Sequence, residues 1–230
     1  MPQLVRVKHI YNKPMKLSVK ECLSFGWSTF KARPWIFVKI AFVLSLVSVV
    51  VNFVNWLVQT GQTMVADDAG LALVLGLVGI VVSLGSIYLG IVLDNMGVTK
   101  FYLNAHDNVV GARVRDLWAP QPFVKYLLTS LLLGLATLVG LILLIIPGII
   151  VALAFGMSLF LVMDRGLGVT ESMKESARIT RGNRLKLLLL GLALLGINLA
   201  GLLLLVVGLI VSLPVSYLAS VHAYRTLSKV

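Results

Sequence analysis

The chain has 230 residues, of which 59% are hydrophobic and only 13% are charged. A soluble domain of this length would be far more polar, so the composition excludes an ordinary soluble enzyme and predicts an all-α integral membrane protein. The formal net charge of +11 could indicate a nucleic-acid-binding protein, but the basic residues cluster at the ends of apolar runs without a recognition motif, so we expect no nucleic-acid partner.

The N-terminal region combines a basic tail with the start of a helix. Residues 1–17 are basic and lack the cleavage site of a signal peptide, so we expect the first apolar run to remain in the protein. Ser18 and Glu21 have the spacing of a capping box, which begins a helix. Apolar residues then recur at helical spacing, namely Val19, Leu23, Trp27 and Phe30. These features predict an interfacial helix over residues 18–33.

Long apolar runs predict six transmembrane helices in a single membrane domain, residues 1–230. About 20 apolar residues cross a hydrocarbon core of ~30 Å, and the runs from Phe123 to Met163 and from Leu187 to Ala223 are about twice that length. Each must fold back, and the expected breaks are Pro147–Gly148 in the first run and Gly208 or Pro214 in the second. The predicted spans form three hairpins and cover residues 35–58, 71–93, 123–145, 148–163, 185–206 and 209–227. Polar segments at 98–118 and 168–182 are expected at the cytoplasmic interface. The helix of the second span is expected to run on into the water through Asp94, Lys100 and Tyr102.

Parts of the sequence repeat. GLILLIIPG at residues 140–148 is similar to GLLLLVVG at residues 201–208, and Lys125 and Lys186 each lie fifteen residues before the leading glycine. SVKECLSFGWSTFKARPW from Ser18 also resembles GVTESMKESARITRGNRL from Gly168. We interpret the chain as repeated units, each an interfacial helix followed by a hairpin of two spans.

The charge distribution predicts the orientation. All 20 Lys and Arg residues fall in the tail, the two long polar connectors, the C-terminal end or the adjoining span ends, which share one side. The opposite connector, residues 59–70, contains Asp67 and Asp68 and no basic residue. The positive-inside rule therefore places both termini in the cytoplasm. Shallow re-entrant hairpins would return the chain to the same side, so the charge pattern is equally compatible with them for the last two pairs.

The polar interval from Asp164 to Lys186 predicts an amphipathic helix at the membrane face. Lys174, Arg178 and Arg181 share one helical face, and Arg184 adds a further positive charge beyond it. The opposite side carries Val169, Met173, Ala177 and Thr180, as expected for a helix half sunk among headgroups. One interpretation is a contact site for anionic lipid headgroups or a membrane-protein partner. The other is a cytoplasmic loop that follows the general charge bias of membrane proteins.

The sequence contains no evident catalytic or metal-binding constellation, so we predict no cofactor and no metal. His9, His106 and His222 are scattered, and Cys22 is the only cysteine. Asp94 and Asp164, at span ends, are expected to cap helices or pair with basic loops. The polar residues predicted inside spans include Asn52, Asn55 and Asn198. They are expected to form hydrogen bonds between helices, although a transport pathway would have to use them.

Several segments resemble a widespread bacterial six-span family related to the membrane domain fused to some glycerophosphodiester phosphodiesterases. They are MGVTKFYLNAHD, LILLIIPGIIVAL, DRGLGVTESMKESARITRGN and PVSYLASVHAYRTL. The resemblance implies a bacterial cytoplasmic membrane and a connection with envelope lipids, without hydrolase activity because the phosphodiesterase domain is missing. We therefore expect a non-enzymatic accessory or scaffold protein. A transporter or channel for a small molecule or lipid is the main alternative, and an enzyme acting on headgroups is a third.

Overall fold

The computed structural model describes residues 17–65, 69–118, 122–204 and 208–229, and all regular secondary structure in these ranges is helical. The predicted basic tail, apart from Leu17, and the acidic pair Asp67 and Asp68 lie outside the described residues. The helices are α1 Val19–Ala32, α2 Pro34–Val65, α3 Ala69–Asp107, the 3-10 turn η2 Val114–Leu117, α4 Phe123–Leu143, α5 Ile145–Phe155, α6 Ser158–Arg165, α7 Val169–Thr180, α8 Arg184–Leu203 and α9 Leu209–Ser228.

Helix α1 begins at the predicted capping residue. The Ser18 hydroxyl accepts a hydrogen bond from the backbone N–H of Glu21, which satisfies one of the free donors in the first turn. The face that α1 buries carries Cys22, Gly26, Thr29 and Phe30, whereas Trp27 remains 46% exposed. The helix ends at Ala32 and is capped by Arg33. Helix α2 starts at Pro34, and proline suits this first helical position because no backbone donor is needed there.

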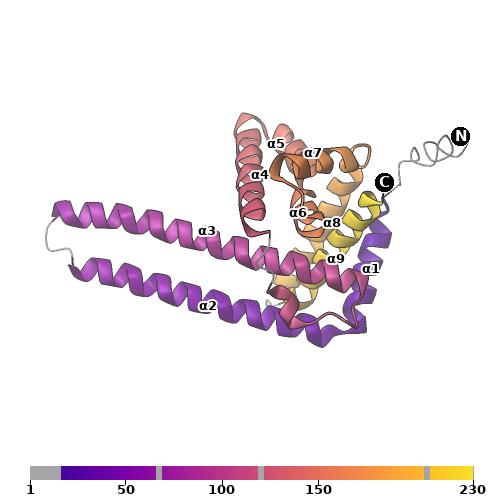
Figure 1. The fold of residues 1–230 in the computed structure, drawn as a ribbon. Helices are drawn as coiled ribbons and strands as arrows, with labels where there is room; N and C mark the ends of the chain where they lie inside the picture. Colours follow the sequence, from indigo (N-terminus) through magenta and orange to yellow (C-terminus); the bar gives the residue numbers. More distant parts are fainter. Residues whose placement is uncertain (1–16, 66–68, 119–121, 205–207, 230) are drawn as a thin grey trace, which may run out of the picture.

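Helices α2 and α3 are much longer than a hydrocarbon core is thick. Their 32 and 39 residues correspond to about 48 and 58 Å at the usual helical rise. The two helices run side by side, and their outer parts extend far beyond the other elements (Figure 1). We call residues 46–65 and 69–91 the arm, and the remaining described residues the body. The predicted helical continuation of the second span is confirmed, because α3 stays helical as far as Asp107. The expectation that this part lies in water is wrong at Tyr102, which is only 5% exposed.

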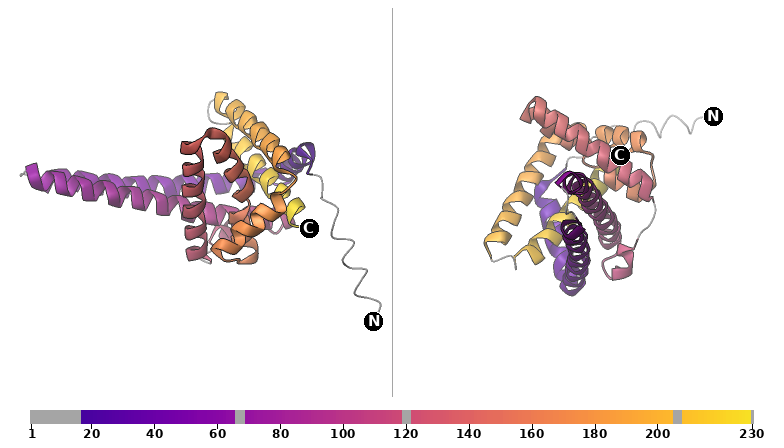
Figure 2. Two further views of the ribbon diagram at one scale, coloured as in Figure 1. Left: turned by 90° about the horizontal axis from the view of Figure 1, so that it is seen from above. Right: turned by 90° about the vertical axis from the view of Figure 1, so that its left-hand side faces the viewer.

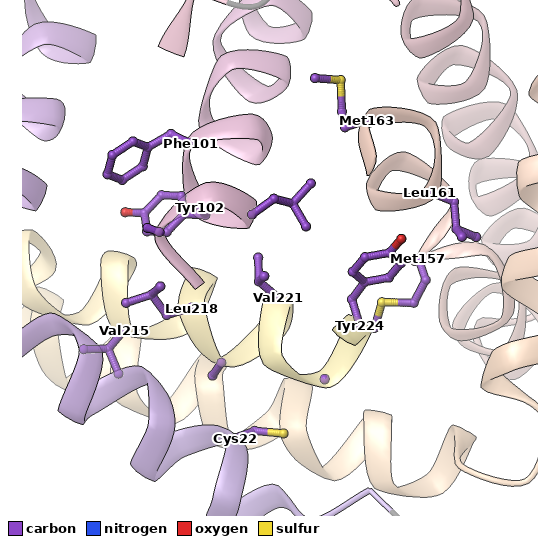
Figure 3. Close-up of a cluster of buried hydrophobic side chains, with 14 of the residues drawn as sticks. Cys22, Phe101, Tyr102, Met157, Leu161, Met163, Val215, Leu218, Val221 and Tyr224 are labelled. Atoms are coloured by element: carbon purple, nitrogen blue, oxygen red, sulfur yellow. The ribbon is translucent and has the colours of Figure 1, made fainter. Parts of the chain in front are cut away.

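The end of α3 belongs to the core of the body rather than to an interfacial segment. Phe101 is fully buried, and Tyr102 and Leu103 are nearly so. The Tyr102 ring stacks on Tyr217 of α9 at a centroid distance of 4.7 Å, and the Phe101 ring packs against Phe37 of α2 at 5.8 Å. Figure 3 shows α9 beside the end of α3, with Leu218 and Val221, which are also fully buried. Within the segment 98–118, which was expected at the interface, the short helix η2 has no buried residue.

The apolar run from Phe123 to Met163 folds back at Leu144, so the predicted break at Pro147–Gly148 is wrong. Leu144 is extended, with φ −171° and ψ 146°, and Pro147 is the third residue of α5. A proline fits there because the first turn of a helix has no intrahelical acceptor for its N–H groups. Gly140 and Gly148 instead allow α4 and α5 to approach closely. A Cβ on Gly140 would lie only 2.8 Å from the Gly148 Cα.

The predicted span 148–163 is divided between two helices. Helix α5 ends at Phe155, Gly156 and Met157 form a turn, and α6 begins at Ser158. The α4–α5 pair runs across the long α2–α3 pair rather than beside it, as the views in Figures 1 and 2 agree.

Helices α8 and α9 also approach each other through glycines. A Cβ on Gly208 would lie 2.5 Å from the Gly201 carbonyl oxygen. Pro214, the other predicted break, lies inside α9 and does not end it. At the other side of α9, α1 packs closely because Gly26 has no side chain; a Cβ there would lie 2.5 Å from the Val215 oxygen. Helix α9 is therefore the central element of the body.

Within the described residues, five helical stretches are long and apolar enough to cross a membrane. They are Pro34–Gly61, Leu73–Asp107, Phe123–Leu143, Ile145–Arg165 and Arg184–Leu203, the fourth comprising α5 and α6. Helix α9, expected as the sixth span, is not among them because its C-terminal half carries His, Tyr and Arg side chains. The chain is thus all-α, with several helices suited to a membrane.

Candidate functional site

The predicted basic face on α7 is a surface of mixed charge. Lys174 and Arg178 are exposed and border a cleft of ≈ 500 Å³, which Glu171 and Glu175 also line. Arg178 donates two hydrogen bonds of 2.7 Å to the Glu175 carboxylate, and Arg165 lies 3.6 Å from it. Hydrogen bonding to Arg178 lowers the pKa of Glu175 below its usual value. Much of the positive charge on this face is therefore balanced by Glu175.

Arg181 and Arg184 do not line that cleft. Arg181 is the exposed residue that ends α7, whereas Arg184 is the half-buried first residue of α8. The Arg184 Nε is buried and has no hydrogen-bond partner among the described residues. The four basic residues predicted as one contact site thus occupy two different environments.

The inner face of α7 binds the break between α5 and α6. Ser176 Oγ donates to the Ala154 carbonyl at 2.8 Å and accepts from the Met157 backbone N–H at 3.2 Å. Thr180 Oγ1 lies 3.2 Å from the same carbonyl. A chain break in an apolar region leaves backbone groups without partners, and these hydroxyls supply them. The buried face of α7 therefore contacts protein, through small polar residues, instead of facing lipid headgroups.

A network centred on Arg225 joins three helix ends that lie far apart in the sequence. The guanidinium donates to both oxygens of Asp164 at 2.8 Å and to Asp107 Oδ2 at 2.6 Å. Tyr224 donates to Asp164 Oδ2 at 2.7 Å. The network thereby ties α3 and α6 to the last turns of α9. Because both oxygens of Asp164 accept strong hydrogen bonds, this carboxylate is already engaged and serves as a structural anchor.

Two histidines meet beside this network. His106 Nε2 and His222 Nδ1 are 3.2 Å apart, although 116 positions separate the residues in the chain. His106 Nδ1 lies 3.1 Å from Asp107 Oδ1, and the Phe25 ring packs against both imidazoles at centroid distances of 4.5 and 4.4 Å. One nitrogen of the pair must donate and the other accept, so the contact requires a neutral imidazole.

The sequence interpretation of scattered histidines missed this pairing. Only the combination of His222, Tyr224 and Arg225 in an otherwise apolar final helix could have signalled a polar cluster. The expected role of Asp164, pairing with a basic group, is found, but its partner comes from α9 and not from a neighbouring loop. In the described part of the chain no three or more His, Cys, Asp or Glu side chains gather as for a metal ion, and His9 lies outside that part.

The three asparagines predicted inside spans have different roles. Asn55 Oδ1 accepts from Ser86 Oγ at 2.9 Å and joins α2 to α3. Asn198 Oδ1 accepts from Ser216 Oγ at 3.3 Å and joins α8 to α9. Asn52 instead donates to the Ser48 carbonyl of its own helix at 2.7 Å. A second bridge in the arm, Gln59 Nε2 to Ser83 Oγ at 3.4 Å, was not expected from the sequence.

Comparison with known proteins gives one similar curated protein. The chain is 31% identical over 115 residues to "Uncharacterized protein Rv2560" of Mycobacterium tuberculosis. The matched region covers 50% of this chain and 35% of that protein, so the chain spans only about a third of the length of the curated relative it matches. No protein-family model matches the chain, and no solved structure matches it.

Proposed function

We propose that this chain is a non-enzymatic accessory or scaffold protein of the bacterial cytoplasmic membrane, with an arm that crosses the bilayer and a body inserted from the cytoplasmic side. The observation that carries the proposal is a contrast between hairpin turns. Where α2 ends and α3 begins, the sequence QTGQTMVADDAG at residues 59–70 is polar and acidic, whereas the α4–α5 turn is wholly apolar. A turn that reaches water needs polar residues, so the two turns belong to different environments.

The exposure of the α4–α5 turn supports this assignment. Leu143, Leu144, Ile145 and Ile146 are each about 70% exposed. Side chains of this kind are stable in hydrocarbon and unfavourable in water, at roughly 1.5–3 kcal/mol each. The α8–α9 turn has the same character, because Leu203 and Leu204 are 84% and 69% exposed and the following residues are apolar as well. We infer that the turns of both short hairpins lie in hydrocarbon without crossing the bilayer, so these two pairs are not four complete spans. Because α4–α5 runs across the arm (Figures 1 and 2), that hairpin lies along the membrane.

Orientation follows from the charges. The Arg225 network and α7 both belong to the body. Residues 59–70, at the far end of the arm, contain two acidic residues and no basic residue. We therefore place both termini and α7 in the cytoplasm. The expected anionic lipid contact of Lys174, Arg178, Arg181 and Arg184 belongs to this proposal, as does the relation to the six-span envelope-lipid family.

A scaffold is favoured over a transporter because the polar side chains among the helices are used to hold them together. Asn198 and Asn55 each bond a serine of the neighbouring helix, and Arg225 bonds two carboxylates. A solute pathway would need such groups to replace water around the solute. For a scaffold we expect a membrane-protein partner, which would bind the arm or the mixed-charge surface of α7.

Flux measurements on reconstituted vesicles test this function. Vesicles that contain the purified full chain should retain a trapped small anionic dye and should not scramble fluorescent phospholipid, with or without the Asn198→Leu substitution. If wild-type vesicles conduct dye or lipid, and Asn198→Leu stops this while the melting temperature is kept, the protein is a transporter. Leu199→Phe, on the exposed side of the same helix, is the matched control.

A further inference from the structure

A groove of ≈ 530 Å³ lies between α1, α8 and α9, at the edge of the body. Its walls include Leu23 and Trp27 from α1, Ile197 and Ala200 from α8, and Val211 and Ser212 from α9. The volume falls within the range of about 300–1,000 Å³ that is typical of ligand sites. Apart from Ser212, these side chains are apolar, so the groove is suited to a hydrocarbon chain.

Ser212 provides one polar point in this wall. Ser212 is only 5% exposed, and its hydroxyl has no hydrogen-bond partner among the described residues. A buried donor without a partner is unfavourable, and native proteins seldom leave one unless something else supplies an acceptor. An ester oxygen at the head of an acyl chain is such an acceptor.

The rim of the groove carries a cation beside an aromatic ring. Leu23, Trp27 and Lys31 follow one another at four-residue intervals, so they form a row along α1. The Lys31 ammonium lies 4.8 Å from the centroid of the Trp27 ring, and Trp27 is half exposed. No carboxylate lies within ion-pair distance of Lys31 in the part of the chain that the structure describes. Tryptophan with lysine is the combination found where a protein meets lipid headgroups.

We propose that this groove binds one acyl chain of an anionic bilayer phospholipid, with its phosphate against Lys31 and an ester oxygen near Ser212. A bilayer lipid is favoured as occupant because Leu204, which lines the groove, is 69% exposed, and its neighbour Leu203 is 84% exposed. Whatever covers these residues also reaches the groove. The site rests on the proposed function only in that it requires the body to lie in the bilayer.

Native mass spectrometry of the full chain, supplied with equal amounts of phosphatidylglycerol and phosphatidylcholine with identical chains, tests this site. The wild-type protein should keep one phosphatidylglycerol in preference. Ala200→Phe fills the groove from an exposed position and should remove the bound lipid, whereas Leu199→Phe, next to it but outside the groove, should keep it. Lys31→Gln should reduce the preference for the anionic lipid about fivefold, and Lys39→Gln, exposed on α2, should not.

Three results would overturn the proposal: equal retention of both lipids by the wild type, retention by Ala200→Phe equal to that by Leu199→Phe, or an unchanged preference in Lys31→Gln. A wild-type dimer that Ala200→Phe dissociates would show a contact between copies instead. If Ala200→Phe lowers the melting temperature, Ile197→Trp obstructs the same groove from another position. Dye or lipid flux in vesicles would contradict the scaffold function without affecting this result, so the two proposals can fail separately.

Discussion

The arm and the body differ in what surrounds their apolar side chains. In the arm, Val81, Leu84 and Leu77 are 57–70% exposed, and the two helices meet through a few polar bridges. In the body, Leu218, Val221 and Tyr224 are fully buried against other helices. An apolar side chain in the sequence therefore does not show by itself whether lipid or protein surrounds it.

The glycines at helix crossings of the body make the same distinction at the level of single atoms, whereas Gly134, Gly191 and Gly196 of the body lie away from such crossings and would meet nothing within 4 Å. A Cβ on Gly76 or Gly85, in the arm, would meet nothing within 4 Å. A Cβ on Gly26, Gly140 or Gly201, in the body, would lie closer than 3 Å to an atom of another helix. The stability of the body therefore depends on close helix packing, whereas that of the arm depends on the medium that surrounds it. Substitutions should consequently be costly in the body and nearly neutral in the arm.

The largest effect is expected at Arg225. Replacement with Leu leaves Asp164, whose side chain is 19% exposed, and Asp107 without their cation, and should lower the free energy of unfolding by about 3 kcal/mol. Arg178→Gln, which breaks an exposed pair on α7, should cost less than about 1 kcal/mol. Unfolding in mixed detergent, followed by circular dichroism, measures both. Equal losses would mean that the network does not hold α3, α6 and α9 together.

Gly26→Ala should be the next most costly substitution. The added methyl would press on the Val215 carbonyl and force α1 away from α9, at about 2 kcal/mol. Gly85→Ala in the arm should be neutral or stabilising by up to about 1 kcal/mol, since alanine restricts the unfolded chain and meets nothing. Melting temperatures of the two variants test the contrast directly. A comparable drop in both would contradict the difference between arm and body.

A smaller loss is predicted for Ser176→Ala. The Met157 N–H would lose its acceptor at the α5–α6 break, which should cost about 1.5 kcal/mol. Ser172→Ala is the control, because that buried hydroxyl bonds only the Val169 carbonyl of its own helix and its loss should cost less than about 0.5 kcal/mol. Hydrogen exchange at residues 154–158 should increase in Ser176→Ala alone. Unchanged exchange there would show that α7 does not secure the break.

The smallest effect belongs to the arm. Asn55→Leu removes the bond from Ser86 and should cost about 0.6 kcal/mol, as is usual for hydrogen bonds between membrane helices. Asn52→Leu removes only a bond within α2 and should change stability by less than that. Steric trapping or thermal unfolding in lipid nanodiscs can compare them. A loss of several kcal/mol at Asn55 would mean that the arm has a polar core of its own.

Local features of the sequence predicted a large part of the fold. The capping pattern at Ser18 located the start of α1, and the apolar runs located α2, α3, α4 and α8. These signals depend on residues within a few turns of one another. The position of the α4–α5 turn was misjudged because Pro147 was taken as a helix breaker, whereas proline is well tolerated in a first turn.

The polar clusters could not be predicted because they depend on distant residues. Arg225 meets Asp107 and Asp164 across 118 and 61 positions, and no local spacing connects them. Similarly, nothing in the sequence around Ser176 indicates that its hydroxyl serves a chain break 19 to 22 positions away. The basic residues of α7 were correctly placed on its exposed side at Lys174 and Arg178, but Glu175 was not recognised as the ion-pair partner of Arg178.

Cysteine labelling examines the arm and the short hairpins together. Burial raises the pKa of the Cys22 thiol to about 11, so it is a poor nucleophile at neutral pH, and Cys22→Ser removes it as a background. Single cysteines then replace Gln62 near the end of α2, Leu144 in the α4–α5 turn and Arg181 after α7. A membrane-impermeant maleimide is added to intact cells and, separately, to permeabilised cells.

Gln62→Cys should react in intact cells, and Arg181→Cys should react only after permeabilisation. Leu144→Cys should react in neither case, because its turn lies in hydrocarbon. Reaction of Leu144→Cys in intact cells would show that α4 crosses the whole bilayer and would contradict the difference between arm and body. Reaction of Arg181→Cys but not Gln62→Cys in intact cells would reverse the orientation.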